Sequence, residues 1–213
     1  MPRNEIWRAS MLKILGKASS INVRKVLWTC DEIGRPFVLE EPVLDSAKFR
    51  ALNPNGLMPV IVDGDFVLWE SNTIIRYLVN DSSALHLLPQ EPRARALVEK
   101  WIDWQATEFN SAWRYAFQAL VRKSAAHQDA ESIRASIRDW SKAVAIVEGQ
   151  VSRSGGYMAG AAFTLADIPI GLSVNRWFMT PIPNRPGFPA VSAYYERLSE
   201  RPGFMRHGRN GIP

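Results

Sequence analysis

Two short runs carry the residue types best suited to binding a ligand: NPNGLMPV at positions 53–60 and ESNT at 70–73. The second run opens a helical pattern, and a helix N-terminus offers unpaired N–H groups and the positive end of the helix dipole to a carboxylate. In the first run Pro59 opens a strand after a turn, which leaves neighbouring main-chain groups free to bind an extended ligand as an added strand would. Together the runs predict a site for a small, peptide-like anion.

Both runs lie in a stretch, 12–80, where short apolar runs alternate with helical patterns. Strands are expected at 12–15, 36–40, 60–62 and 66–68, and helices at 22–33 and 71–80. The turn Asp63-Gly64-Asp65, between two apolar runs, is the best hairpin signal in the chain. The order β-α-β, then helix or loop, then β-β-α predicts a compact α/β sandwich.

Beyond position 80 the strand patterns stop. Positions 82–92 are polar and indicate a linker, after which apolar residues recur with helical period. One long helix is expected at 93–123, with one set of side chains on neighbouring turns: Trp101, Trp104, Glu108, Ser111 and Tyr115. Another helix carries Trp140, Val144, Val147 and Val151. This second part of the chain is therefore predicted to be all-helical.

A third helix of this region begins at FTLADI, 163–168. Thr164 and Asp167 have the spacing of a capping box, in which a hydroxyl and a side chain three residues later satisfy each other's orphan N–H groups. Asp167 stands where Glu or Gln is usual, so this is a shorter variant. We interpret the pair as structural.

Composition narrows the possible classes of protein. The chain has 213 residues, 46% hydrophobic and 22% charged, which is typical of a globular protein. No apolar run approaches the roughly 20 residues of a membrane span, and the N-terminus does not resemble a signal peptide. We therefore expect no membrane association and a cytoplasmic location.

Metal and nucleic-acid sites are not expected. Cys30 is the only cysteine, which excludes an internal disulfide or a Cys-rich metal site, and the three histidines lack ligand spacing: His86, His127 and His207. The net charge of +5 comes from dispersed basic residues without a dense tract. This pattern predicts a basic surface that attracts small anions and no nucleic acid.

The chain resembles a cytosolic glutathione S-transferase from position 11 to its end. Five motifs in order carry the resemblance: SINVRKVL at 20–27, NPNGLMPV at 53–60, Glu70-Ser71, TLAD at 164–167 and ERPGF at 200–204. It implies an α/β plus all-α fold: a thioredoxin-like glutathione-binding domain at 11–81, a linker at 82–92, and an all-helical domain at 93–213 that contributes the electrophile site. Positions 1–10 have no counterpart and are an N-terminal extension, so Met1 or Met11 is the natural start.

The resemblance also implies how glutathione binds. The bond before Pro59 is expected to be cis, with the Met58 main chain pairing with the cysteinyl unit. Glu70 and Ser71 are expected to hold the γ-glutamyl end: Ser71 can cap the helix and offer its hydroxyl and N–H to the α-carboxylate, while Glu70 suits an ammonium group.

The glycyl carboxylate has no obvious partner. The basic residues that clamp it in related classes are not evident near Leu44 and Asp45. Lys48 or Arg50 is the expected substitute.

Catalysis in this family requires the glutathione thiol to become a thiolate. A free thiol of this type has a pKa of about 8.5, and each unit of depression needs about 1.4 kcal/mol. One hydrogen bond to the anion, worth about 1.5–3 kcal/mol, is of the right size. By resemblance to the serine-type theta and phi patterns, Ser20 is the principal candidate; Ser19 is the nearest rival, and Asn22 is an accessory or replacement donor.

The serine at position 20 argues against a glutaredoxin-like reductase or a dehydroascorbate reductase, which use a cysteine there. Cys30 lies inside a helical pattern and is interpreted as packed rather than reactive.

For the second substrate, an apolar wall is expected from Trp113, Phe117 and Trp177, with Tyr115, Phe178 and Met179 as further candidates. An aromatic stripe at helical spacing is, however, more often core than pocket. In the homodimer that the family implies, Asp103 and Gln105 are expected to face the partner subunit.

The resulting hypothesis is a glutathione transferase that conjugates the glutathione thiolate to hydrophobic electrophiles, with glutathione as co-substrate and no metal. The alternatives are a glutathione-dependent lyase, dehalogenase or peroxidase, or a non-catalytic glutathione-binding or structural protein. The sequence does not identify the electrophile.

Overall fold

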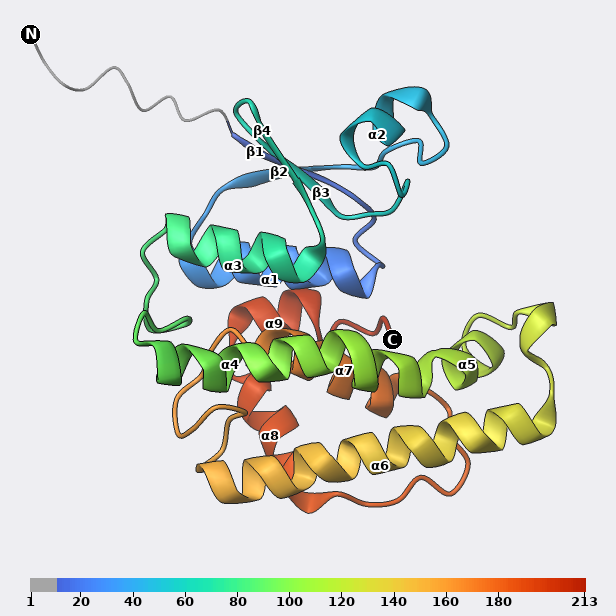
Figure 1. Ribbon diagram of the computed structural model, residues 1–213. Coiled ribbons are helices and arrows are strands. Elements are labelled where there is room, and N and C mark those ends of the chain that lie inside the picture. The colour runs from blue at the N-terminus through green and yellow to red at the C-terminus, as the bar shows by residue number, and fades with distance from the viewer. Residues whose placement is uncertain (1–10) are drawn as a thin grey trace, which may run out of the picture. The chain divides into compact units, whose positions relative to one another are not determined.

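The structure, a computed structural model, describes residues 11–213; the predicted N-terminal extension, 1–10, lies outside the described residues. The chain divides into two compact units, Met1–Ala84 and Leu85–Pro213. Figure 1 shows a sheet with helices in the first unit and helices in the second. Each unit is described by itself.

The first unit is built on a four-stranded mixed sheet. Its strands are β1 (Leu12–Leu15), β2 (Phe37–Glu40), β3 (Val60–Asp63) and β4 (Phe66–Trp69), in the spatial order β2-β1-β3-β4. β1 is parallel to β2 and antiparallel to β3, which is antiparallel to β4. The helices are α1 (Ile21–Ile33), α2 (Ala47–Leu52) and α3 (Ser71–Asp81). α1 and α3 lie side by side against one face of the sheet (Figure 1).

The local sequence explains these elements. β1 alternates the buried Leu12 and Ile14 with the exposed Lys13, as a strand with one covered face does. A two-residue loop joins β3 to β4, with Gly64 at a φ of 65° that favours glycine. The predicted strands and helices of this unit agree with the observed ones to within one residue at each end.

One edge of this sheet gathers the segments that the sequence singles out. Glu40, Leu15, Val60 and Trp69 pair in one row across the four strands. β1, β2 and β4 end at this row, and β3 begins at it. Because neighbouring strands lie about 4.8 Å apart, the edge from β2 to β4 is about 14 Å long. The loops that leave it are therefore close enough to share one small ligand.

The second unit is helical throughout its regular elements. Its α-helices are α4 (Pro92–Trp104), α5 (Asn110–Leu120), α6 (Ala130–Ser154), α7 (Asp167–Met179), α8 (Pro189–Ser199) and α9 (Pro202–His207). A π-helical segment, Gln105–Phe109, joins α4 to α5, and a short 3₁₀ turn, Ala125–His127, precedes α6. The predicted fold class, a thioredoxin-like domain followed by an all-helical domain, is confirmed.

The prediction of one α-helix at 93–123 is wrong in two respects. The π segment interrupts the α-helical hydrogen bonding, and α5 ends at Leu120. At that end the N–H groups of Val121 and Arg122 both donate to the carbonyl of Phe117, and Lys123 adopts a φ of 52°. The chain therefore turns away from the helix axis.

Asp167 is the most heavily bonded buried carboxylate of this unit's described residues. Its Oδ1 accepts from the Met158 N–H at 2.8 Å and the Tyr194 hydroxyl at 3.0 Å, and its Oδ2 accepts from the Thr164 N–H at 2.8 Å and the Thr164 hydroxyl at 3.1 Å. Burial raises the pKa of Asp167 to about 6, although these four hydrogen bonds act to lower it. The structural interpretation of the Thr164–Asp167 pair is confirmed, but the Thr164 hydroxyl donates to the carboxylate instead of capping an N–H.

Candidate functional site

The turn at 53–57 is closed by the side chain of Asn53, which is buried. Its Nδ2 donates to the Leu57 carbonyl at 2.7 Å, and its Oδ1 accepts from the Asn55 N–H at 3.0 Å. Gly56 adopts a φ of 63°, and its N–H donates to the Asn53 carbonyl at 2.9 Å. The turn is thus fixed by its own hydrogen bonds and delivers Met58 to the sheet edge.

The peptide bond between Met58 and Pro59 is cis, as expected. Neither the N–H nor the C=O of Met58 is hydrogen-bonded within residues 11–213. The Met58 main chain therefore offers one donor and one acceptor to a ligand that runs alongside it, as a neighbouring strand would.

Ser71 lies at the far side of the same edge, where α3 begins. The expectation that Ser71 caps this helix is wrong. Ser71 is the first helical residue, and Glu70 occupies the N-cap position with φ 75° and ψ 106° and makes no side-chain cap. The side chain of Glu70 therefore does not cover the N-terminus of α3, and Ser71 is largely buried beside it. This is an arrangement that holds a carboxylate.

Ser20 lies at the N-cap position of α1, directly after the loop that leaves β1. Its backbone is extended, its N–H donates to the Lys17 carbonyl at 2.9 Å, and its side chain makes no cap hydrogen bond. The hydroxyl has no partner within residues 11–213, and the residue is half-buried. Ser20 thus presents a free hydroxyl beside the positive end of α1.

The two rivals of Ser20 lie beside it. Ser19 is exposed in the loop, and Asn22 is half-buried in the first turn of α1. The structure therefore brings all three candidate donors to the end of β1.

The two basic candidates at the β2 end of the edge differ in their bonding. Arg50 forms an ion pair with Asp45 at 3.1 Å, and its Nη1 lies 3.1 Å from the point that a Gly56 Cβ would occupy. Arg50 is therefore tied to the 53–57 turn. Lys48 is exposed, has no ion-pair partner within the described residues, and lines a cavity of about 330 Å³ together with Leu15.

Cys30 lies in α1 with no exposed surface. Burial, helped by the neighbouring Asp31, raises the pKa of its thiol to about 12. The interpretation of Cys30 as a packed residue is confirmed.

This burial makes a testable prediction for Cys30. A maleimide at pH 8 is expected to label the native protein far more slowly than the protein in denaturant, because the reagent needs an accessible thiolate. Mass spectrometry of timed samples measures the difference. Complete labelling of native protein within minutes would contradict it.

The aromatic candidates for an electrophile wall pack inside the second unit. Trp113, Phe117 and Trp177 are nearly fully buried. The guanidinium of Arg176 lies 4.3 Å from the ring centre of Trp113 and 3.9 Å from that of Phe117, and Trp177 stacks edge-on against Trp140 at 5.2 Å. These contacts are those of core side chains.

Gln105 is also inward. Its Nε2 donates to the Ser173 hydroxyl at 3.0 Å, and the residue is buried within this unit, so the expectation that it faces a partner subunit is wrong. Asp103, in contrast, is exposed.

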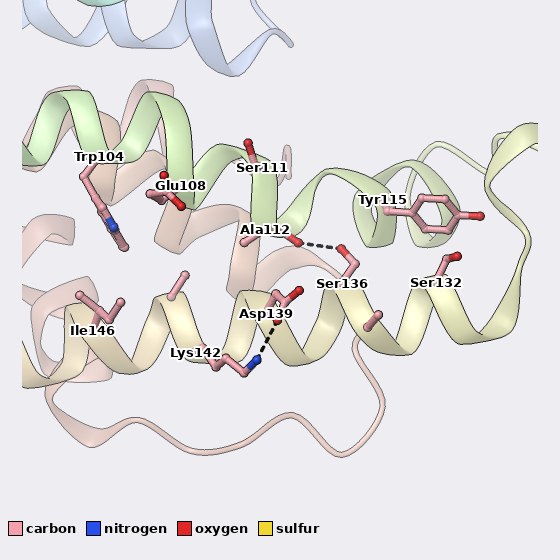
Figure 2. A pocket seen from close by; sticks show the side chains of 12 residues that line it. Trp104, Glu108, Ser111, Ala112, Tyr115, Ser132, Ser136, Asp139, Lys142 and Ile146 are labelled. Carbon is pink, nitrogen blue, oxygen red and sulfur yellow. Dashed lines mark hydrogen bonds and ion pairs between the residues drawn. The ribbon is translucent and has the colours of Figure 1, made fainter.

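A groove of about 570 Å³ runs along the second unit between α6 and the segment from the end of α4 through the π turn to α5 (Figure 2). One wall carries Trp104, Glu108, Ser111 and Tyr115, which the sequence places on one helix face; α6 supplies the other, including Ser132, Asp139, Lys142 and Ile146. The α6 residues of this wall recur with helical spacing, so the helical period of the sequence is the signal that could have identified them. Asp139 and Lys142 form an ion pair across 2.9 Å, and no catalytic group predicted from the sequence lines the groove.

Two kinds of feature are absent from residues 11–213. No helix there is long and apolar enough to cross a membrane. No group of three or more His, Cys, Asp or Glu side chains in that range is placed to hold a metal ion.

Comparisons with known proteins agree with the sequence motifs. The family model "Glutathione S-transferase, N-terminal domain" matches residues 15–84, and "Glutathione S-transferase, C-terminal domain" matches 110–202. Glutathione S-transferase GstB of Escherichia coli (strain K12) is 33% identical over 208 residues, which cover 92% of this chain and 97% of that protein. Glutathione S-transferase 3 of Zea mays is also 33% identical, over 92% of each chain.

Among solved structures, the theta class glutathione S-transferase of Xanthomonas axonopodis pv. citri, with glutathione bound, superposes with a TM-score of 0.88. It is 36% identical, and the match covers 95% of this chain and 99% of that one.

Proposed function

Since the chain belongs to the glutathione S-transferase family, we propose that it binds glutathione along the sheet edge of its first unit and conjugates the thiolate to hydrophobic electrophiles. The observation that carries this proposal is the free Ser20 hydroxyl at the start of α1, on the same edge as the cis Met58–Pro59 bond and the N-terminus of α3, where Glu70 makes no side-chain cap. Glutathione is a co-substrate in this reaction, and no metal is needed.

In the proposed complex, each part of glutathione meets a different part of the sheet edge. The γ-glutamyl carboxylate lies at the first turn of α3, next to Ser71, with Glu70 near the ammonium group. The cysteinyl unit pairs with the main chain of Met58 beside Pro59. Its sulfur then reaches the β1 end, where Ser20 is the main hydrogen-bond donor and Asn22 an accessory one. At the β2 end, Lys48 is a candidate cation.

The chemistry that follows is nucleophilic substitution or addition by a preorganised thiolate. Ser20 and the N-terminus of α1 stabilise the anion, and the main-chain contacts at Met58 orient it. Trp113, Phe117 and Trp177 are buried in the core of the second unit, so they are retained only as supports of an electrophile site and not as its wall.

The decisive experiment is a glutathione titration followed by a conjugation assay with an aromatic halide. Binding at millimolar glutathione together with turnover supports the proposal. Absence of binding at that concentration would overturn it. Binding without turnover on a panel that includes alkyl halides and hydroperoxides would instead favour a non-catalytic protein, and turnover on one of those classes alone would favour a dehalogenase or peroxidase.

Ser71 makes a separate prediction for substrate binding. Ser71→Ala is expected to raise the KM for glutathione about 10- to 100-fold, because a hydrogen bond to a carboxylate is worth about 1.5–3 kcal/mol. The value of kcat should change little, since the γ-glutamyl end is bound equally in the ground and transition states. Thr73→Ala, an exposed position on the same first turn, is the control. A fall in kcat at constant KM would remove Ser71 from this role.

We further propose that the protein is a cytoplasmic homodimer that acts in detoxification. The single cysteine, buried and unpaired, suits a reducing compartment. Dimer formation is tested by sedimentation equilibrium, which should give about twice the chain mass of 24.0 kDa.

A further inference from the structure

Lys17 contacts three of the segments that meet at the sheet edge. Its carbonyl accepts the Ser20 N–H at 2.9 Å, and its own N–H donates to the Sδ of Met58 at 3.2 Å. Its ammonium lies 2.8 Å from the Oε1 of Glu41, the residue that follows β2. Lys17 therefore joins the loop after β1, the residue before Pro59 and the end of β2.

The direction of the bound tripeptide leads to this residue. With the γ-glutamyl end at α3, after β4, and the cysteinyl unit at β3, the peptide runs toward β1 and β2. An extended tripeptide spans about 10 Å at roughly 3.3–3.6 Å per residue. The edge is about 14 Å long, at about 4.8 Å per strand spacing. The glycyl carboxylate therefore ends between β1 and β2, where the Lys17–Glu41 pair lies.

We propose that Lys17 binds the glycyl carboxylate of glutathione, an inference that rests on the proposed function. An ammonium group has three donors, so Glu41 keeps one hydrogen bond while the ligand takes another. About half of the Lys17 side chain is exposed, at 49%, so the group is accessible to a ligand. Glu41 holds the ammonium at the edge before the ligand arrives.

The other cations of this region fit the role less well. Arg50 is committed to Asp45 and lies against Gly56. Lys48 sits on α2 and has no partner that fixes its ammonium within the described residues. Lys17 is the cation whose residue also contacts Met58, which is expected to hold the adjoining cysteinyl unit.

The test compares glutathione with its glycyl monoethyl ester, in which the glycyl carboxylate carries no charge. Isothermal titration calorimetry with the full chain gives the two affinities. The wild type is expected to bind glutathione about 5- to 10-fold more tightly than the ester. Lys17→Gln should weaken glutathione binding by that same factor, leave the ester unchanged, and so abolish the preference. The pKa of the bound thiol should stay as in the wild type, because Ser20 is intact.

A matched control is Lys13→Gln. Lys13 is a half-exposed lysine of β1 that pairs with Glu40 at 3.8 Å, so this variant removes the same charge from a lysine outside the Lys17–Glu41 pair. It should keep the wild-type preference. Circular dichroism of both variants checks that they fold.

Three outcomes would overturn the assignment. In the first, Lys17→Gln keeps the preference for glutathione over the ester. In the second, Lys48→Gln loses this preference and Lys17→Gln does not. In the third, the wild type binds both ligands equally. In each case glutathione still binds and the proposed function stands. A wild type that binds neither ligand would overturn the proposed function itself, and the Lys17 assignment with it.

Discussion

Ser20→Ala is expected to raise the pKa of the bound glutathione thiol by about one to two units. The estimate follows from the loss of one hydrogen bond to an anion, about 1.5–3 kcal/mol, at about 1.4 kcal/mol per pKa unit. The absorbance of the thiolate, followed against pH in wild type and variant, measures the shift. The Ser20 hydroxyl has no hydrogen-bond partner within the described residues, so the substitution disturbs little else.

The activity of Ser20→Ala should depend strongly on pH. At a pH below the wild-type thiol pKa, the variant holds about 10- to 100-fold less of the bound glutathione as thiolate than the wild type does. A more basic thiolate is also more nucleophilic, with a Brønsted coefficient of about 0.4–0.5, so kcat should fall by about 3- to 15-fold at neutral pH. Above the raised pKa the variant should recover to wild-type rates or exceed them. A uniform loss of activity at all pH values would instead indicate lost orientation.

Neighbouring residues supply the controls for this prediction. Ser20→Thr retains a hydroxyl at the N-cap position and should preserve most of the pKa depression. Ser19→Ala, at an exposed position, should leave the titration unchanged. An unchanged thiol pKa in Ser20→Ala, together with a shift in Ser19→Ala or Asn22→Ala, would transfer the role of main donor. Even without Ser20, the N-terminus of α1 should keep the pKa below about 8.5, the value of a free thiol.

Local periodicity predicted the first unit well. Leu12 and Ile14 alternate with a polar residue, and Gly64 marks a two-residue turn, so the strands were found to within one residue. The sequence does not predict the backbone conformation of Glu70, because a non-glycine residue with a φ of 75° has no clear sequence signal. The cis bond at Pro59 came from the family resemblance, since most X-Pro bonds are trans.

The aromatic residues show where periodicity stops being informative. Aromatic side chains lie on two faces of the same helical run: Trp104 and Tyr115 line the groove against α6, whereas Trp113 and Phe117 face the core. Spacing alone does not say which face is covered. The face with Trp113 and Phe117 is covered because the buried side chain of Arg176 packs against both rings. Arg176 comes from α7, far along the chain, so local spacing cannot predict this contact. The π segment at Gln105–Phe109 also rotates the positions of the side chains that follow it around the helix axis, which a constant period of about 3.6 residues cannot predict.

Asp167→Ala is expected to lower the free energy of unfolding by about 3–5 kcal/mol at pH 7. The substitution leaves two buried backbone N–H groups, of Met158 and Thr164, without an acceptor, and each such group costs about 1–3 kcal/mol. Urea denaturation followed by tryptophan fluorescence measures the loss. Thr164→Val, which removes one of the four donors and keeps the shape, should cost about 1 kcal/mol. Equal losses in the two variants would show that the backbone contacts contribute little.

The pH dependence of this effect has a defined sign. An unfolded Asp has a pKa of about 3.9, and burial raises that of Asp167 to about 6 in the folded protein. A carboxyl group with a raised folded pKa contributes stability that is fully present below pH 4 and is lost as pH rises through 6. Asn cannot ionise, so the advantage of the wild type over Asp167→Asn should shrink as pH rises from 4 to 7. A growing advantage over that interval would mean that the four donors outweigh burial and hold the folded pKa below its unfolded value.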